Sequence, residues 1–281
     1  MYDRRRIEES FGSCPECFTR SYVRTWKALM VYLKSSEEIS KIRSAGKILQ
    51  EIFERIGKAL KPGITTMQLN SIAEEIISAR NAKASFLNYG EPPFPASICA
   101  SINEEVVHGI PSEKRILKDG DIISIDAGAY LDGFHADAAR TYAVGDVGKD
   151  ILKLIEVTRE CFFKGFEEIR EGNRISDVSA AVEKHAVSHG YGVVRQLTGH
   201  GIGRNLHEDP DVPNFLLHER GPRIREGLVI AVEPMINMGS EKVYMLDDGW
   251  TIVTADYKPS AHYENTVAVT ANGPQLMTED M

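Results

Sequence analysis

The sequence has few cysteines, no long apolar run and no excess of basic residues. Its four cysteines, at positions 14, 17, 99 and 161 of 281 residues, are too few and too scattered for a disulfide framework. No apolar run approaches the roughly 18 residues of a membrane span, and no apolar segment follows the basic N-terminal tract as in a secretory signal. The net charge of −8 disfavours a general nucleic-acid binder. These absences predict a soluble protein of a reducing compartment, with a cytoplasmic location.

Residues 1–33 differ from the rest of the chain. They hold an arginine run, Arg4-Arg5-Arg6, and one Cys14-Pro-Glu-Cys17 pair, without clear periodicity. Such a pair can be half of a zinc site, but no second pair follows and the first histidine is His108. We expect residues 1–33 to be an N-terminal extension and residues 34–281 to form one large domain, which a hydrophobic content of 42% allows.

The most informative stretch runs from Ile122 to Tyr142 and predicts two strands joined at Asp132-Gly133, a dipeptide that favours a tight hairpin. With the turn centred there, Asp126 lies opposite Ala139 and diagonal to Asp137. With the turn one residue earlier, the two aspartates face each other. Both registers put the carboxylates on one face, roughly 5–8 Å apart. Two buried anions so close require a shared proton or a cation between them.

Helical patterns come before this hairpin and recur after it. Ser35 with Glu38, and Thr65 with Gln68, form capping boxes ahead of apolar residues at helical spacing. Two further helical patterns follow in the second half. They cover residues 150–171, ending at Gly172, and a stretch from Val178 to Gly190.

The strands repeat as well. The run Leu228-Val-Ile-Ala-Val-Glu233 matches the strand that carries Asp126, and a later strand, Ala261 to Val269, has Glu264 near its start. Each half therefore reads as two helices followed by strands, and each supplies two carboxylates. This internal duplication predicts an α+β domain with two pseudo-symmetric halves and its acids gathered between them.

Five residues converge in this scheme: Asp126, Asp137, His200, Glu233 and Glu264. Four carboxylates and an imidazole suit divalent metals that take oxygen and nitrogen ligands, and two dications would balance the four charges. Two metals roughly 3.5–4 Å apart, with a shared water that loses its proton and attacks, form a known hydrolytic arrangement.

Each piece taken alone has an ordinary structural explanation. An aspartate after an apolar strand is usually an edge or turn residue, and His200 in its glycine-rich segment can satisfy backbone groups. The run Gly199–Gly203 matches neither a Walker motif nor a dinucleotide-binding fingerprint. The joint pattern carries the argument, because the repeat delivers acids at matching places in both halves.

Over about residues 36–275 the chain resembles the type I methionine aminopeptidases of metallopeptidase family M24, whose fold is known as the pita bread. The resemblance rests on these stretches: Asn103–Pro111, Asp126-Ala-Gly128, Asp132–Asp137, Thr198–Gly203, Leu206–Pro210, Val232–Met235 and Ser260–Thr266. It implies an antiparallel sheet inside and helices outside, and an enzyme that removes the N-terminal methionine from nascent proteins and peptides, favouring a small second residue.

The resemblance also implies roles for residues. The five converging residues would bind two divalent metals, bridged by Asp137 and Glu264, and water activated there would attack the first peptide bond. Glu233 is then the partner of that water, and His108 and His207 contact the substrate and move protons. Without the resemblance, neither histidine would be assigned a function, because an isolated histidine is more often structural. Two further residues, Cys99 and Trp250, match wall positions of a pocket for an unbranched apolar side chain.

The chain departs from the family in places. Phe86–Pro95 stands where members commonly carry tyrosine-rich sequence, and Leu206 stands where a phenylalanine often precedes the second histidine. Residues 1–33 do not match the zinc-finger extensions of some members. We therefore expect the chain to keep the pocket for the methionine side chain, but with a lining that differs from that of other family members.

Two other functions compete with this one. A proline-specific peptidase of the same fold usually carries a large extra N-terminal domain, which about 33 residues cannot form. A non-catalytic binding module of this fold would lack metal ligands, and all five are present. The sequence leaves the metal open among cobalt, manganese, iron and zinc. It predicts a monomer that acts on nascent polypeptide N-termini without binding DNA or membranes. A transient ribosome contact through the basic arm stays open.

Overall fold

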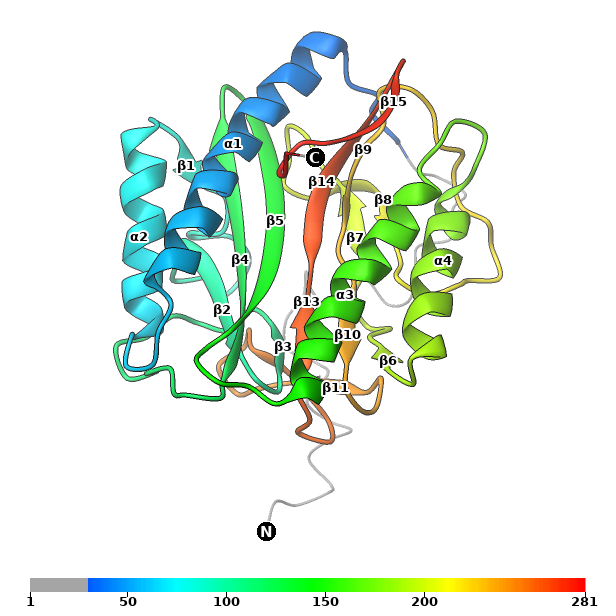
Figure 1. The fold of residues 1–281 in the computed structure, drawn as a ribbon. Helices are drawn as coiled ribbons and strands as arrows, with labels where there is room; N and C mark the ends of the chain where they lie inside the picture. Colours follow the sequence, from blue (N-terminus) through cyan, green and yellow to red (C-terminus); the bar gives the residue numbers. More distant parts are fainter. Residues whose placement is uncertain (1–29, 281) are drawn as a thin grey trace.

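The computed structural model describes residues 30–280, so the predictions on the Arg4–Arg6 run and on Cys14 and Cys17 lie outside the described residues. Within this range the helices are α1 (Ser36–Ala59), α2 (Thr66–Ala79), α3 (Lys149–Glu167) and α4 (Ile175–Ser188). The strands are β1 (Lys83–Ala84), β2 (Ile98–Ile102), β3 (Glu105–Val107), β4 (Ile122–Leu131), β5 (Phe134–Ala143), β6 (Gly192–Val193), β7 (Gly199–Gly201), β8 (Glu208–Val212), β9 (Val229–Val232), β10 (Met235–Asn237), β11 (Val243–Met245), β12 (Ile252–Thr254), β13 (Ser260–His262), β14 (Glu264–Thr270) and β15 (Gly273–Leu276). Figure 1 shows their arrangement.

Both predicted capping boxes are present and start the helices of the first half. The Ser35 hydroxyl accepts a hydrogen bond from the backbone N–H of Glu38, and the Glu38 carboxylate accepts one from the Ser35 N–H at 2.9 Å. Thr65 and Gln68 make the same reciprocal pair at the start of α2. These hydrogen bonds satisfy backbone N–H groups at each helix start that have no partner within the helix. In the second half, α3 ends at Glu167, earlier than the predicted residue 171.

An antiparallel sheet joins the two halves of the chain. Its strand order is β1-β4-β5-β14-β9-β7-β8, with β2 on β4 and β15 on β14. The first half contributes β4 and β5, the second contributes β9 and β14, and the halves meet where β5 pairs with β14 (Figure 1). The predicted α+β fold, with a sheet and helices packed against it, is confirmed.

Equivalent contacts in the two halves bear out the internal duplication. An isolated antiparallel bridge joins Thr65 to Ile116 in the first half, and another joins Arg174 to Arg223 in the second. Thr65 and Arg174 precede the second helix of their halves, and Ile116 and Arg223 precede matching strands. The same supersecondary unit is therefore built twice, which puts corresponding strand ends near each other at the centre.

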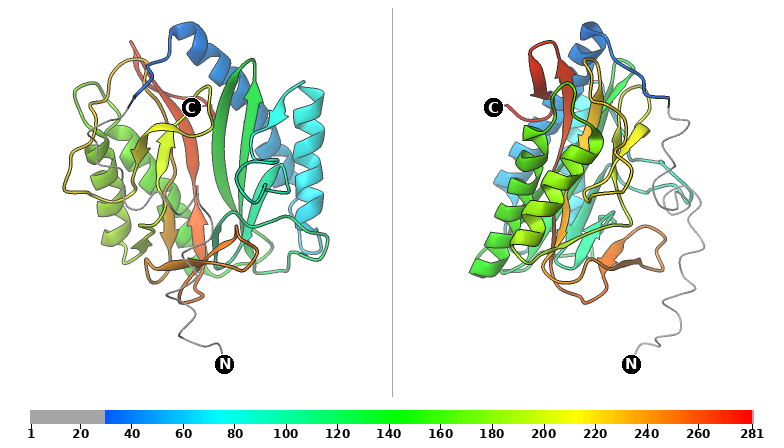
Figure 2. Two further views of the ribbon diagram at one scale, coloured as in Figure 1. Left: turned by 180° about the vertical axis from the view of Figure 1, so that it is seen from behind. Right: turned by 90° about the vertical axis from the view of Figure 1, so that its right-hand side faces the viewer.

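The helices cover one face of the sheet. Alternate residues of β4 pack in one apolar cluster with buried residues of α1 and α2, and they are Ile123, Ile125, Ala127 and Ala129. Because side chains alternate along a strand, Asp126 points to the opposite face. The side view of Figure 2 shows the helices on one side of the sheet and loops and short strands on the other.

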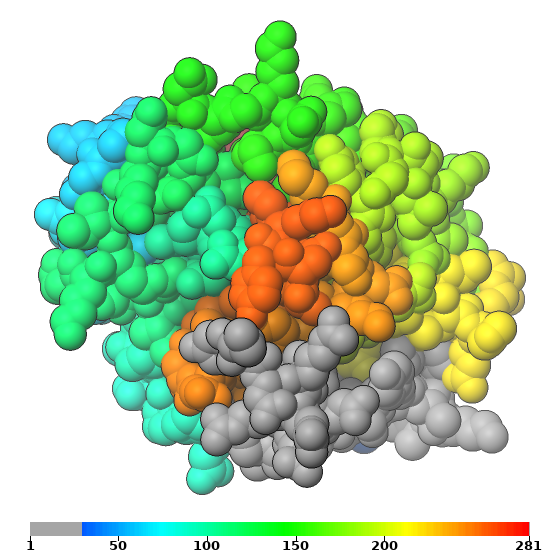
Figure 3. All heavy atoms as spheres, turned by 90° about the horizontal axis from the view of Figure 1, so that it is seen from below, coloured from blue at the N-terminus to red at the C-terminus, as the bar shows by residue number. Residues whose placement is uncertain are grey.

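The last predicted strand is divided in the structure. The sequence predicts one strand over residues 261–269, whereas Tyr263 separates β13 from β14 in the structure. The two parts join different sheets, since β13 pairs with β10 and β14 pairs with β5 and β9. Seen from below in Figure 3, the orange segment that includes β11 to β13 lies between the first and second halves. Within residues 30–280, none of the helices has the length and apolar character needed to span a bilayer.

Candidate metal centre

The two aspartates of the hairpin share a face with one glutamate from the other half. In the β4–β5 pairing Asp126 lies opposite Ala139, the register of a turn centred on Asp132-Gly133. Asp137 stands two residues before Ala139 and therefore points the same way. Ala139 also pairs with Glu264 across the join between the halves. Asp126, Asp137 and Glu264 thus project from three adjacent strands onto one face.

The other two predicted ligands reach this face from the second half. Ala231 pairs with Thr266 on one side and with His200 on the other. Thr266 stands two residues after Glu264, so His200 and Glu264 share a face. Glu233 follows Ala231 by two residues, directly after the last residue of β9, and continues the same alternation. The pairing register therefore brings all five predicted ligands to the face opposite the helices.

The side chains themselves are close. Asp137, His200 and Glu264 each offer one ligand atom, and these atoms lie within 4.8 Å of one another. His200 Nε2 is 3.6 Å from Glu233 Oε1. Asp126, Asp137, His200 and Glu264 are buried, and the Glu233 side chain is only 14% exposed. Such a group of acids is largely shielded from solvent.

Burial changes the protonation of these acids. It raises the pKa of Asp126 to about 7. Burial, reinforced by the charges of neighbouring acids, raises the pKa of Asp137, Glu233 and Glu264 well above the usual range. Four carboxylates can be ionised together at neutral pH only with cations among them.

The donor atoms fit such cations. Among the described residues, Asp126 Oδ1, Asp137 Oδ1 and Glu264 Oε1 are buried without a hydrogen-bond partner. His200 Nδ1 donates to the backbone oxygen of Gly201 at 2.9 Å, which leaves the Nε2 lone pair directed toward the acids. A set of carboxylate oxygens and one imidazole nitrogen suits manganese, iron, cobalt or zinc.

His207 lies beside this centre. Its ring packs edge-on against that of His200, with 4.3 Å between the ring centroids. Its Nδ1 shares a hydrogen bond with the hydroxyl of Tyr89. Tyr89 belongs to the stretch Phe86–Pro95 that departs from the family pattern, and sequence reasoning gave it no role. The tyrosine fixes the orientation of the imidazole.

His108, Cys99 and Trp250 form a neighbouring group. Cys99 pairs with Asp126 across β2 and β4, so its side chain faces the same way. The ring of His108 meets the edge of Trp250 at a centroid distance of 5.9 Å, and Phe94 packs edge-on against Trp250 at 5.1 Å. Burial lowers the pKa of His108 to about 4, so this imidazole is neutral at pH 7.

His108 also has an unusual backbone. Its φ is +60°, a left-handed conformation that is uncommon for residues other than glycine. Such strain persists where the surrounding structure fixes it, and it is frequent at functional sites.

His262 is a residue that sequence reasoning missed. Its Nε2 lies 3.9 Å from a carboxylate oxygen of Glu233 and 3.9 Å from one of Glu264, and the side chain is buried. Burial lowers the pKa of His262 to about 3, so the ring is neutral. The available signal was its position two residues before Glu264, within a stretch that resembles the family.

Known proteins are similar to this chain in sequence and in fold. Residues 40–271 match metallopeptidase family M24. The methionine aminopeptidase of Clostridium acetobutylicum is 51% identical over 249 residues, which span 89% of this chain and 99% of that protein. Methionine aminopeptidase 1 of Bacillus subtilis is 46% identical with the same coverage. The solved methionine aminopeptidase of Thermotoga maritima superimposes with a TM-score of 0.86 at 38% identity, covering 89% of this chain and all of that one.

More distant structures share the fold alone. The Xaa-Pro dipeptidase from Bacillus anthracis is 23% identical with a TM-score of 0.70, and the alignment covers 62% of its chain.

Proposed function

The chain belongs to metallopeptidase family M24, in the group of methionine aminopeptidases, and from this premise we propose that it removes the N-terminal methionine from nascent proteins and peptides. As a metallo-exopeptidase it is a hydrolase. The observation that carries the proposal is the convergence of the five predicted ligands on one sheet face, four of them from β4, β5, β7 and β14 and the fifth, Glu233, from the residue after β9. A cytoplasmic, monomeric enzyme that meets polypeptides near the ribosome is part of the same proposal.

The five side chains Asp126, Asp137, His200, Glu233 and Glu264 would hold two divalent ions. Two dications balance four ionised carboxylates, and they give partners to the unpaired buried oxygens. When bound, such ions lower the pKa of a water molecule and polarise a carbonyl group. The remaining chemistry falls to this chain's own groups.

Glu233 is the proposed acceptor of the proton that the attacking water loses. Its oxygens lie 3.6 Å from His200 Nε2 and 3.9 Å from His262 Nε2, so two imidazole rings flank this carboxylate. His207, oriented by Tyr89, is proposed to hold the scissile peptide group and to pass a proton to the leaving nitrogen. Neutral His108 can donate a hydrogen bond to the substrate without adding charge.

Cys99 and Trp250 are proposed as walls of the pocket that accepts the methionine side chain. Both are buried, and Trp250 is held by Phe94 and by a hydrogen bond from its indole nitrogen to the Pro92 oxygen at 3.1 Å. An apolar pocket with a fixed aromatic wall favours a long unbranched side chain. The preference for a small second residue belongs to the same proposal.

Peptide hydrolysis tests this function. Metal-stripped protein is resupplied with manganese or cobalt and given Met-Gly-Met, with Ala-Pro in parallel. The proposal expects metal-dependent release of methionine and no cleavage of Ala-Pro. Cleavage of Ala-Pro alone would assign a proline-specific peptidase instead. Failure to cleave either peptide with metal bound would assign a binding module.

A further inference from the structure

We propose that Glu160, His185 and His189 form a second, peripheral site for a divalent transition ion of the zinc class, between helices α3 and α4. The proposed peptidase reaction uses none of these residues, so this inference stands independently of it. Among the described residues, the three bring one ligand atom each within 4.8 Å of one another, as do Asp137, His200 and Glu264 in the candidate metal centre.

The helices hold these side chains in place. His185 and His189 are four residues apart on α4 and its C-terminal cap, so they lie on one helix face, and their ring centroids are 4.6 Å apart. Glu160 reaches them from α3, and its Oε2 accepts a hydrogen bond from His185 Nε2 at 2.8 Å, so an ion held between these two groups would displace that proton to solvent. The two helices approach closely at Gly165, where a side-chain carbon would meet Val182 at 2.8 Å.

The hydrogen bonding leaves a metal-binding nitrogen on His189. Its Nδ1 lies 2.9 Å from the backbone oxygen of His185. A carbonyl only accepts, so Nδ1 carries the hydrogen and Nε2 keeps a free lone pair. A metal-bound histidine typically donates its other nitrogen to a backbone carbonyl in this way. The bond therefore prepares His189 as a ligand.

The donor set decides the class of ion. Two histidines four residues apart on a helix, completed by one glutamate, are a known zinc-binding combination that leaves a position for water. Two imidazoles among three ligands favour zinc, nickel or copper over magnesium or calcium, which prefer oxygen. The His185 contact lowers the pKa of Glu160, so its carboxylate is ionised.

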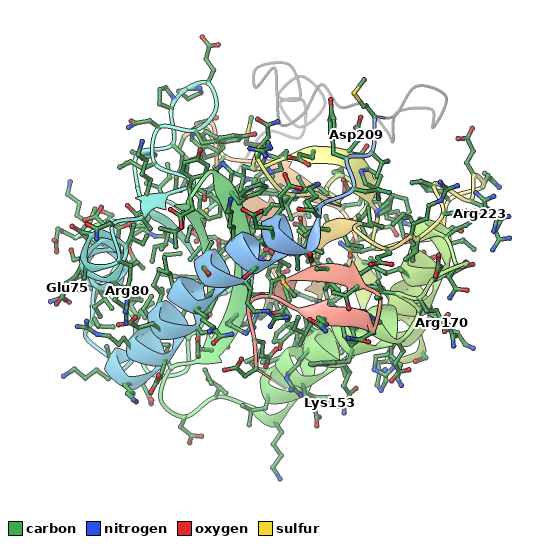
Figure 4. All side chains as sticks on the ribbon, turned by 90° about the horizontal axis from the view of Figure 1, so that it is seen from above. Glu75, Arg80, Lys153, Arg170, Asp209 and Arg223 are labelled. Carbon is green, nitrogen blue, oxygen red and sulfur yellow. The ribbon has the colours of Figure 1, made fainter. Side chains whose placement is uncertain are left out.

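The site lies on the helix-covered side of the molecule. Figure 4 shows Lys153 of α3 and Asp209 of β8 on opposite sides. Asp209 stands two residues from His207, beside the candidate metal centre, whereas Lys153 precedes Glu160 by two helical turns on α3. The Lys153 ammonium bonds to Glu156 at 2.8 Å, which leaves the Glu160 carboxylate to His185. An ion here would join α3 to α4 without touching the peptidase chemistry.

Zinc stoichiometry tests the site. The full chain, freed of metal, is equilibrated with Zn²⁺, and the bound zinc is counted in His189→Ala, His185→Ala and Glu160→Gln. We expect the wild-type chain to bind one more zinc per molecule than either histidine variant. We expect Glu160→Gln to bind that zinc at least tenfold more weakly. His218→Ala, which removes an exposed histidine elsewhere, is the control and should match the wild type.

Unchanged folding is checked by far-UV circular dichroism and by methionine release in manganese, which all four variants should retain. Equal zinc counts and affinities in the wild type and all three site variants would overturn the proposal. Loss of zinc in His218→Ala as well would show non-specific surface binding and would also overturn it.

Discussion

Lys34 and Glu208 form a buried ion pair that ties the segment before α1 to the residue next to His207. The ammonium nitrogen lies 2.6 Å from Glu208 Oε2, and the two side chains are only 5% and 6% exposed. Glu208 Oε1 accepts from the backbone N–H of Asn205 at 3.0 Å. Glu208, which follows His207, is therefore held both by Lys34 and by Asn205, which lies two residues before His207. Loss of the ion pair is expected to disturb the position of His207.

Replacing one partner should be costly. Lys34→Met leaves the Glu208 charge buried and unpaired, and we expect a loss of about 3–5 kcal/mol in the free energy of unfolding. Lys41→Met removes an exposed pair with Glu37 and should cost no more than about 1 kcal/mol. Urea unfolding of both variants gives the comparison. Equal effects of the two substitutions would contradict a special role for the buried pair.

Tyr89→Phe should lower activity without unfolding the chain. The substitution removes the hydroxyl that orients the His207 imidazole, and we expect kcat/KM for a methionyl peptide to fall about tenfold. Steady-state kinetics in manganese measure this. The matched control is Tyr257→Phe, which removes an exposed hydroxyl bonded to Tyr244. If Tyr89→Phe is as active as the Tyr257→Phe control, the Tyr89 hydroxyl does not contribute to activity through His207.

The ring nitrogen of His262 is expected to contribute to activity. Its Nε2 lies 3.9 Å from an oxygen of Glu233 and 3.9 Å from one of Glu264, so His262→Leu replaces a polar nitrogen with an apolar surface against two carboxylates. We expect kcat/KM to drop at least tenfold in His262→Leu, whereas His262→Gln, which keeps a polar N–H, should retain most activity. If both variants behave alike, the ring contributes only volume.

The metal-free protein should lose stability through Asp126 as the pH rises. The folded carboxyl has its pKa raised to about 7, whereas in the unfolded chain it ionises near the ordinary value of 3.8. Between these values the folded state holds a proton that the unfolded state has lost, so increasing pH favours unfolding. Below about pH 4 and above about pH 7 this contribution is constant.

Comparison with Asp126→Asn isolates this group, because the amide does not titrate. In metal-free urea titrations, the stability of the variant relative to wild type should rise from pH 4 to pH 7, by an amount on the order of a few kcal/mol. Saturating manganese should reverse the order, since only the wild-type site keeps all its ligands. A difference independent of pH would refute the raised pKa.

Local signals account for most of what the sequence predicted. The capping boxes at Ser35 and Thr65 depend on contacts within one helical turn, and the Asp132-Gly133 turn sets the register that pairs Asp126 with Ala139. The acids fall on one face because strand periodicity is 2 and the unit is duplicated. These features are visible from residues close together in the chain.

Contacts between distant residues account for what was missed. Lys34 and Glu208 are 174 positions apart, and no periodic pattern links them. Tyr263 divides the last strand because β13 and β14 join different sheets, which depends on where β10 and β5 lie. His262 reaches the acids as a consequence of that division. Such relationships require the assembled fold.

The central claim is that five side chains hold two divalent ions, and anomalous X-ray scattering tests it directly. Crystals of the protein grown with manganese would be measured with X-rays at which manganese scatters anomalously. The account predicts two peaks roughly 3.5–4 Å apart, contacted by Asp126, Asp137, His200, Glu233 and Glu264. A single peak, or peaks that leave any of these five residues without contact to a metal, would contradict it.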